Sequence, residues 1–246
     1  MLRKIFFSLL IISFYFCHLS AIELNKAFDM RQLKGKRVGY YTGSFDPIHL
    51  GHQHLIISAL TNDHVDYVLV YPVPGGDKLK SRLDFKTRLE MIATIFKDHP
   101  QVLYTKWTPK QIQDRFAKYR NTIEIVGIIG SDVVDRLIAD DATIEKYREA
   151  CMPGRKLKPK HYNDTTGAIT ALKPDAFIVG LREKVAFGRT IGDRPIKAFI
   201  ASSNLSSSEV RKAVSAHLPF KHMLDEKVET FICQQHLYQK RENKVQ

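Results

Sequence analysis

Two histidines that stand three positions apart, His49 and His52, are the residues of this chain best suited to chemistry. Residues with that spacing share one face of a helix, so the two imidazoles would point the same way. Gly51 lies between them and lets a ligand approach the backbone closely. The zinc-protease pattern needs histidines four apart with a glutamate, so this spacing favours a polyphosphate site over a metal site. Cys151 and Cys233 form no Cys-x-x-Cys pair, and we predict no metal-ligating residues.

The segment before these histidines predicts an anion-binding turn. The apolar run at 38–41 suits a buried strand, and the run at 55–60 continues a helical pattern. We expect the helix to begin at Asp46 and Pro47, as an N-cap and a first-turn proline. Backbone N–H groups at a helix start and in the turn at 42–44 attract phosphate. The alternative is a plain strand-turn-helix corner with two surface histidines.

A second candidate for anion binding lies near the end of the chain. Ser206, Ser207 and Ser208 open a helical pattern over 206–216, where serines cap the helix and leave further N–H groups for anions. Arg211 lies about one turn into this helix and could reach the β- and γ-phosphates of a nucleotide with its bidentate fork. A serine-rich cap followed by a surface arginine would explain the same residues without a ligand.

Two more groups of polar residues follow predicted strands. Gly130 and Asp132 come directly after the buried run 123–129, where an aspartate most often only caps the next helix. The eleven positions 78–88 after a Gly-Gly loop are rich in cations, which include Lys78, Lys80, Arg82 and Arg88. No Gly-Lys-Ser/Thr sequence follows that loop, so it is not a Walker A motif.

Apolar runs alternate with helical stretches from residue 36 onward. We expect strands at 38–41, 65–71, 123–129, 176–179 and 196–201, and helices at 85–96, 132–138, 206–216 and 225–235. This alternation predicts an α/β fold, a Rossmann-like doubly wound parallel sheet in a single domain, with ligands at the carboxyl ends of the strands. The interval 140–175 departs from the pattern and reads as an inserted loop.

The N-terminus has the form of a secretory signal. Arg3 and Lys4 precede an almost wholly apolar run at 5–17, which is too short to span a bilayer as a helix. We therefore expect residues 1–21 to be a signal segment that directs export. Residues 22–246 would then form the domain, without stable membrane insertion. If translation starts at Met30 instead, the protein is cytoplasmic.

The composition is basic, with 38 Lys and Arg against 26 Asp and Glu and a net charge of +12. Removal of residues 1–21 takes away two basic residues and no acid, which leaves +10. Such an excess attracts nucleotide phosphates, nucleic acid or an anionic membrane surface without choosing among them. The basic run 153–161 has little aromatic interleaving, so a solvated loop is favoured over nucleic-acid binding.

Two motifs taken together resemble a known superfamily. The stretch 43–52, Gly-Ser-Phe-Asp-Pro-Ile-His-Leu-Gly-His, is similar to the signature of nucleotidyltransferases with a His-x-Gly-His motif. The stretch 205–211, Leu-Ser-Ser-Ser-Glu-Val-Arg, resembles their second motif. The ending at 218–238 resembles that of bacterial nicotinate or nicotinamide mononucleotide adenylyltransferases, so the resemblance covers roughly residues 37–238. It implies adenylyl transfer from ATP, with Mg²⁺, to a mononucleotide phosphate, giving a dinucleotide and pyrophosphate without a covalent enzyme intermediate.

The resemblance also implies roles for individual residues. His49 and His52 would stabilise charge on the α- and β-phosphates as pyrophosphate leaves. Lys78 and Arg88 would face the nucleotide and acceptor phosphates. Gly43, Ser44 and Phe45 would contact the triphosphate or the second substrate, next to Thr42 of the anion-binding turn. Gly130 and Asp132 would hold the ribose, and Arg182 lies in the region that holds the adenine.

One segment departs from the pattern of those adenylyltransferases. They usually carry a Ser-Tyr-Thr-type segment that helps hold the pyridine ring, where this chain reads Thr-Lys-Trp-Thr-Pro-Lys-Gln at 105–111. Phosphopantetheine adenylyltransferase and the cytidylyltransferases share the first motif and stay open as alternatives. An exported, non-catalytic nucleotide- or nucleic-acid-binding protein is the remaining alternative, although simple binding does not require both histidines. The expected partners are ATP and a small phosphorylated acceptor, with nucleic acid disfavoured.

Overall fold

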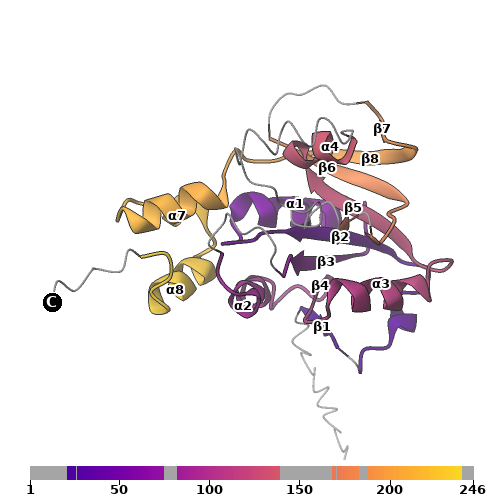
Figure 1. Ribbon diagram of the computed structural model, residues 1–246, viewed down its shortest axis with the longest axis horizontal. Helices are drawn as coiled ribbons and strands as arrows, with labels where there is room; N and C mark the ends of the chain where they lie inside the picture. Colours follow the sequence, from indigo (N-terminus) through magenta and orange to yellow (C-terminus); the bar gives the residue numbers. More distant parts are fainter. Residues whose placement is uncertain are drawn as a thin grey trace, which may run out of the picture.

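The computed structural model describes residues 21–25, 27–74, 82–138, 168–169, 171–182 and 188–239. Within these residues, eight strands form a sheet in the order β1-β4-β3-β2-β5-β6-β8-β7, and neighbours are parallel except for β7 and β8 (Figure 1). The strands are Ile22–Leu24 (β1), Arg37–Gly43 (β2), Tyr67–Pro72 (β3), Val102–Thr105 (β4), Glu124–Gly130 (β5), Ala176–Leu181 (β6), Thr190–Ile191 (β7) and Arg194–Ala201 (β8). The predicted α/β, Rossmann-like class is confirmed.

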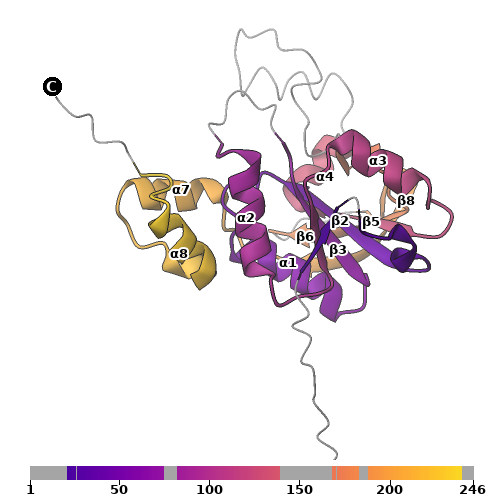
Figure 2. The same ribbon diagram turned by 90° about the horizontal axis from the view of Figure 1, so that it is seen from below.

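Helices cover both faces of the sheet. They are Leu50–Thr61 (α1), Phe85–Ile95 (α2), Pro109–Ala117 (α3), Ser131–Ile138 (α4), Ser207–Ser215 (α7) and Glu226–Gln234 (α8), with 3-10 turns at Met30–Leu33 and Lys221–Met223. One core lies under α1, α2, α7 and α8, and a second lies under α3 and α4. Figure 2 shows α3 and α4 on one side of the strands and α1 on the other. Neighbouring residues of β2 serve opposite cores, Tyr41 the first and Tyr40 the second, because strand side chains alternate between faces.

The residue patterns missed three strands, β1, β4 and β7, and one α-helix, α3. The strands are short, and α3 is mostly polar, with only Ile112 and Phe116 buried. A usable signal was present, because Thr108 and Gln111 form a capping box at the start of α3. At the end of the predicted insertion, 140–175, the described residues 168–169 and 171 are helical, and Ile169 and Leu172 are buried in the second core. Residues 139–167 of that interval lie outside the described residues.

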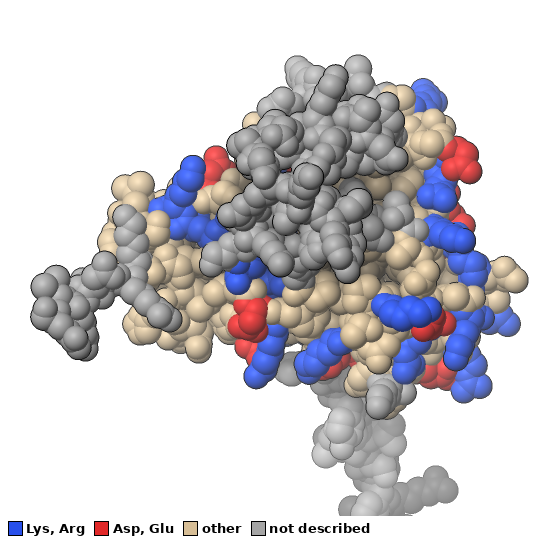
Figure 3. Space-filling model, in the orientation of Figure 1, with Lys and Arg blue, Asp and Glu red and all other residues tan. Residues whose placement is uncertain are grey.

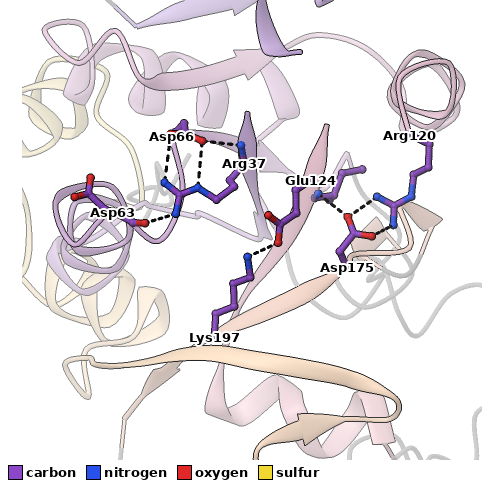
Figure 4. Close-up of polar contacts among 8 residues, drawn as sticks. Arg37, Asp63, Asp66, Arg120, Glu124, Asp175 and Lys197 are labelled. Atoms are coloured by element: carbon purple, nitrogen blue, oxygen red, sulfur yellow. Dashed lines mark hydrogen bonds and ion pairs between the residues drawn. The ribbon is translucent and has the colours of Figure 1, made fainter. Parts of the chain in front are cut away.

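Ion pairs join the strands at their amino ends (Figure 4). Asp175 accepts two hydrogen bonds from Arg120, at 2.5 and 2.6 Å, and one from the backbone N–H of Ile125 at 2.8 Å. Two further pairs are Arg37–Asp66 and Lys197–Glu124. Such half-exposed pairs contribute about 1 kcal/mol or less each. They nonetheless neutralise cations at the amino edge of the sheet. This edge is opposite to the one where β2 and β5 end.

The surface carries mixed charge. On the face seen in Figure 3, Lys and Arg side chains lie among Asp and Glu along the right-hand margin rather than in one continuous patch. No helix in the described part of the chain has the length and apolar character that crossing a bilayer requires. The predicted signal segment lies outside the described residues up to residue 20, and Ala21 already hydrogen-bonds the carbonyl of Lys97 at 3.1 Å.

Candidate functional site

Strand β2 leads directly into the helix that carries the histidines. Helix α1 begins at Leu50, and His49 is its N-cap with an extended backbone (φ −129°, ψ 171°). The prediction that the helix starts at Asp46 and Pro47 is therefore wrong. Asp46 does not cap the helix because its carboxylate is fully buried and accepts a hydrogen bond from the hydroxyl of Tyr238 at 2.8 Å.

The two imidazoles stack on each other at the start of α1, whereas the spacing predicted only that they share one face of a helix. The ring centroids of His49 and His52 are 3.6 Å apart, with 24° between the ring planes. The backbone N–H of His49 donates to Nδ1 of His52 at 3.3 Å, which assigns the proton of a neutral His52 to Nε2. Both ring nitrogens of His49 are buried without a hydrogen-bond partner among the described residues. Buried polar groups without a partner are exceptions in folded proteins, which makes His49 a candidate binding residue.

Phe45 supports this pair from within the core. Its ring is 1% exposed and meets the ring of His52 edge-on, at 5.0 Å between centroids and 81° between planes. Its other edge-on contact is with Tyr41, at 5.1 Å. The side chain predicted to touch the triphosphate or second substrate is thus packed behind an imidazole, which differs from the expectation. Thr42 is also buried, at 2% exposed, so a ligand would meet these residues through their backbone.

Burial keeps both histidines uncharged. Desolvation lowers the pKa of His49 to about 4, and the positive charge of Arg182 lowers it further. Desolvation also lowers the pKa of His52 well below its usual value, with added effects from His49 and Arg182. At neutral pH both rings are therefore neutral, which permits their close stacking and leaves one N–H donor on each.

Stability should fall as the pH drops below neutral, and His49 is one identifiable cause. Above pH 6.5 its imidazole is mostly neutral in both the folded and the unfolded protein. Between pH 6.5 and about 4, His49 is protonated in the unfolded chain but stays neutral in the folded protein. This difference lowers the free energy of unfolding by about 2 to 3 kcal/mol. Urea unfolding at pH 7 and pH 4.5 measures this loss, and His49→Asn should lack that part of it. An equal loss in both proteins would contradict the lowered pKa.

The second motif meets the first at the start of α7. Ser207 donates its hydroxyl to the carbonyl of Pro47 at 2.9 Å, across 160 positions of sequence. Arg211 donates from Nη1 to the carbonyl of Asp46 at 2.5 Å and from Nη2 to Oγ of Ser208 at 3.1 Å. The guanidinium of Arg211 is thus bound to the backbone of Asp46, which precedes His49 by three residues. Two helix N-termini with their free N–H groups and one guanidinium gather in this region.

Ser206 has a structural task in this arrangement. It is the N-cap of α7, and its hydroxyl donates to the carboxylate of Glu209 at 2.8 Å and accepts from the N–H of Glu209 at 3.2 Å. The N–H of Ser206 donates to the same carboxylate at 2.8 Å. This capping box fixes the first turn of α7 and so the direction in which its N–H groups point.

Arg88 is placed differently from its prediction. Its side chain is 1% exposed, and its three nitrogens donate to the carbonyls of Leu83 at 2.9 Å, Ser44 at 2.6 Å and Val73 at 2.8 Å. Burial lowers the pKa of this guanidinium, partly offset by Asp46. Arg88 therefore clamps the segments that follow β2 and β3 and does not face a phosphate. Lys78, predicted to act with it, lies outside the described residues.

Gly130, Asp132 and Arg182 meet at the ends of two neighbouring strands. Gly130 of β5 pairs in register with Gly180 of β6, so the residues after them lie side by side. A side chain at Gly130 would stand 2.5 Å from Oδ1 of Asp132, so only glycine lets this carboxylate fold back over the strand end. Arg182 lies 3.7 Å from the same oxygen. The positive charge of Arg182 also acts on both histidines and lowers the pKa of each, so Arg182 lies within electrostatic range of the imidazole pair.

Ser203 is a site residue that sequence reasoning missed. Its hydroxyl is buried and has no hydrogen-bond partner in the described part of the chain. A Cβ atom added to Gly51 would lie 2.4 Å from that hydroxyl and 3.2 Å from the ring of His49, so Ser203 lines the same narrow space. Its place just after β8, at the carboxyl edge of a parallel sheet, was the available signal.

Gly51→Ala should obstruct this space while leaving the fold intact. The added methyl group would overlap Ser203 Oγ and crowd His49, so affinity for a nucleoside triphosphate should fall about tenfold, equivalent to roughly 1.4 kcal/mol. The stability cost is offset because alanine favours a helix over glycine by about 1 kcal/mol. Titration calorimetry measures the affinity. Adding Ser203→Ala should restore it, and Gly188→Ala, whose methyl group meets nothing within 4 Å, should not change it. Wild-type affinity in Gly51→Ala would argue against this binding position.

This chain is similar to known proteins over a region that includes both the histidine motif at 43–52 and the serine-arginine motif at 205–211. The family model described as Cytidylyltransferase-like matches residues 40–213. A probable nicotinate-nucleotide adenylyltransferase from Coprothermobacter proteolyticus is 23% identical over 213 residues, covering 85% of this chain and 98% of that protein. Another from Albidiferax ferrireducens is 25% identical over 215 residues, covering 83% and 98%. The solved structure of Plasmodium falciparum nicotinic acid mononucleotide adenylyltransferase complexed with NaAD has the same fold, with a TM-score of 0.56, 17% identity and coverage of 82% of this chain and 97% of that one.

Proposed function

Since the chain belongs to the cytidylyltransferase-like family, we propose that it transfers the adenylyl group of ATP to the phosphate of nicotinate or nicotinamide mononucleotide. The products are a dinucleotide and pyrophosphate. The names of relatives that align over nearly their whole length support this choice of reaction. The observation that carries the proposal is the junction of the two motifs, in which Ser207 and Arg211 bond the turn that leads to the paired imidazoles.

The site suits the chemistry of phosphate displacement. A phosphate oxygen of the acceptor attacks the α-phosphorus of ATP in line, and a new P–O bond forms there. The bond from that phosphorus to the oxygen that bridges to the β-phosphate breaks, and its electron pair leaves with pyrophosphate. Little covalent chemistry is left to the protein, so catalysis consists mostly of positioning and of stabilising charge.

The residues divide this work in the proposal. The neutral imidazoles of His49 and His52 donate N–H groups to the α- and β-phosphate oxygens, where negative charge develops. Arg211, whose side chain is 26% exposed, binds the β- and γ-phosphates. Asp132, at the end of β5, takes the ribose hydroxyls, as carboxylates do in other dinucleotide folds.

Mg²⁺ enters this proposal as part of the ATP substrate. This ion keeps several water ligands and usually binds through substrate phosphates and one or two carboxylates. In the described part of the chain, no group of three or more His, Cys, Asp or Glu side chains could hold a metal. The Asp46 carboxylate, nearest the histidines in sequence, is buried and bonded to Tyr238. In the proposal the ion is therefore the one that ATP brings.

A pyrophosphate assay across substrates tests the proposal. The purified protein is incubated with Mg²⁺, either ATP or CTP, and one of three acceptors, nicotinate mononucleotide, nicotinamide mononucleotide or phosphopantetheine. Pyrophosphate and dinucleotide should appear in equal amounts with ATP and a pyridine mononucleotide. Turnover only with CTP or only with phosphopantetheine would assign the chain to another branch of the superfamily. No pyrophosphate with any acceptor would overturn the proposal of an enzyme.

A further inference from the structure

The C-terminal segment of the described chain returns to the site. Helix α8 packs against α2, and Figure 1 shows α7 and α8 side by side at the end of the sheet where α1 and α2 lie. After α8 the chain turns, and Tyr238 adopts a left-handed backbone conformation with φ +61°. Its ring packs against the first core, and its hydroxyl reaches Oδ1 of Asp46 at 2.8 Å, across 192 positions of sequence.

Asp46 connects this tyrosine to Arg211. The carbonyl of Asp46 accepts a hydrogen bond from Nη1 of Arg211 at 2.5 Å, and its carboxylate Oδ2 lies 3.8 Å from the same nitrogen. One residue therefore holds the guanidinium through both its backbone and its side chain. The exposed fraction of the Arg211 side chain is 26%, so a ligand can still reach it.

The buried carboxylate depends on few donors for its orientation. Asp46 is 0% exposed, so water cannot satisfy its oxygens. The backbone N–H of Leu83 is 3.4 Å from Oδ1, a long contact, while the hydroxyl of Tyr238 is at 2.8 Å. Oδ2 accepts no hydrogen bond among the described residues. Tyr238 is thus the short, well-defined donor that sets which oxygen faces Arg211.

We propose that Tyr238 is a positioning residue for Arg211, acting through the carboxylate of Asp46. The inference rests on the proposed adenylyl transfer, in which Arg211 binds the β- and γ-phosphates. Without the hydroxyl of Tyr238, the carboxylate of Asp46 can rotate and move the guanidinium of Arg211 away from the position in which it binds the triphosphate. The three residues come from the turn after β2, from α7 and from the segment after α8, so the end of the fold controls the phosphate site.

Tyr238→Phe tests this inference through a ligand comparison. The affinity for a non-hydrolysable ATP analogue should fall about tenfold, as expected when one hydrogen bond to a charged group is lost. The affinity for AMP, which lacks the β- and γ-phosphates, should stay unchanged. An anchor that only stabilises the fold would lower the melting temperature and leave the ratio of the two affinities alone. Tyr104→Phe is the matched control, since its partly buried hydroxyl makes no hydrogen bond within the described residues.

A double-mutant cycle tests the route through Arg211. In the Arg211→Ala protein, Tyr238→Phe should cause no further loss of kcat or of affinity for the ATP analogue, because the group it positions is gone. Additive losses, or an unchanged ratio of ATP-analogue to AMP affinity in Tyr238→Phe, would overturn the inference while the wild type still releases pyrophosphate. A wild type that neither turns over nor prefers the triphosphate to AMP would overturn the proposed function and this inference with it.

Discussion

His49→Ala or His52→Ala should lower kcat by about a hundredfold to a thousandfold, the range measured when one donor to developing charge is removed. In the proposed mechanism each imidazole of the stacked pair, with ring centroids 3.6 Å apart, offers one N–H to the phosphates. Steady-state pyrophosphate release with ATP and nicotinate mononucleotide measures the effect. The loss should appear in kcat more than in the affinity for ATP, because the charge develops in the transition state.

His54→Ala is the matched control for these variants. His54 lies on the same helix and is exposed, with a contact to Oγ of Ser58 at 3.5 Å. Its replacement should leave kcat within twofold of the wild type. Circular dichroism should show that all three variants keep the native fold. Near-normal turnover in both His49→Ala and His52→Ala would remove the imidazoles from the mechanism.

Arg88→Met should cause the largest loss of stability among single replacements near the site. It leaves one buried and two partly buried carbonyls without their charged donor, and each orphaned group costs about 1 to 3 kcal/mol. The free energy of unfolding should therefore fall by at least about 3 kcal/mol. Because the clamp also holds the carbonyl of Ser44 in the turn before the histidines, activity should fall with it. Urea unfolding monitored by the fluorescence of Trp107 measures the stability.

Two further variants on α2 serve as controls for the loss of stability in Arg88→Met. Lys86→Met removes an exposed cation whose Nζ is 3.7 Å from Glu90, and should change stability by less than about 0.5 kcal/mol. Arg88→Lys keeps the charge but cannot reach three separate carbonyls from one ammonium, so it should recover only part of the loss. If Arg88→Met unfolds at the wild-type urea concentration, the clamp does not hold the turn.

Much of the fold and the outline of the site followed from local patterns. The apolar runs of β2, β3, β5 and β6 marked strands buried on both faces, and the helical periods marked α2, α4, α7 and α8. These patterns are local, because strand and helix periodicity is set by residues within a few positions of one another. The face shared by His49 and His52 and the serine cap of α7 are local in the same sense.

The tertiary structure alone decided what the polar groups do once they are buried. The start of α1 at Leu50, the clamp made by Arg88 and the bond from Tyr238 to Asp46 were not predictable from neighbouring residues. A carboxylate, a guanidinium or a hydroxyl in this core must find whichever partner the fold brings near, because an unsatisfied buried group is costly. Apart from the Leu83 carbonyl, five positions from Arg88, those partners lie 15 to 192 positions away in sequence, so spacing identifies the chemical groups and the packed fold determines their partners.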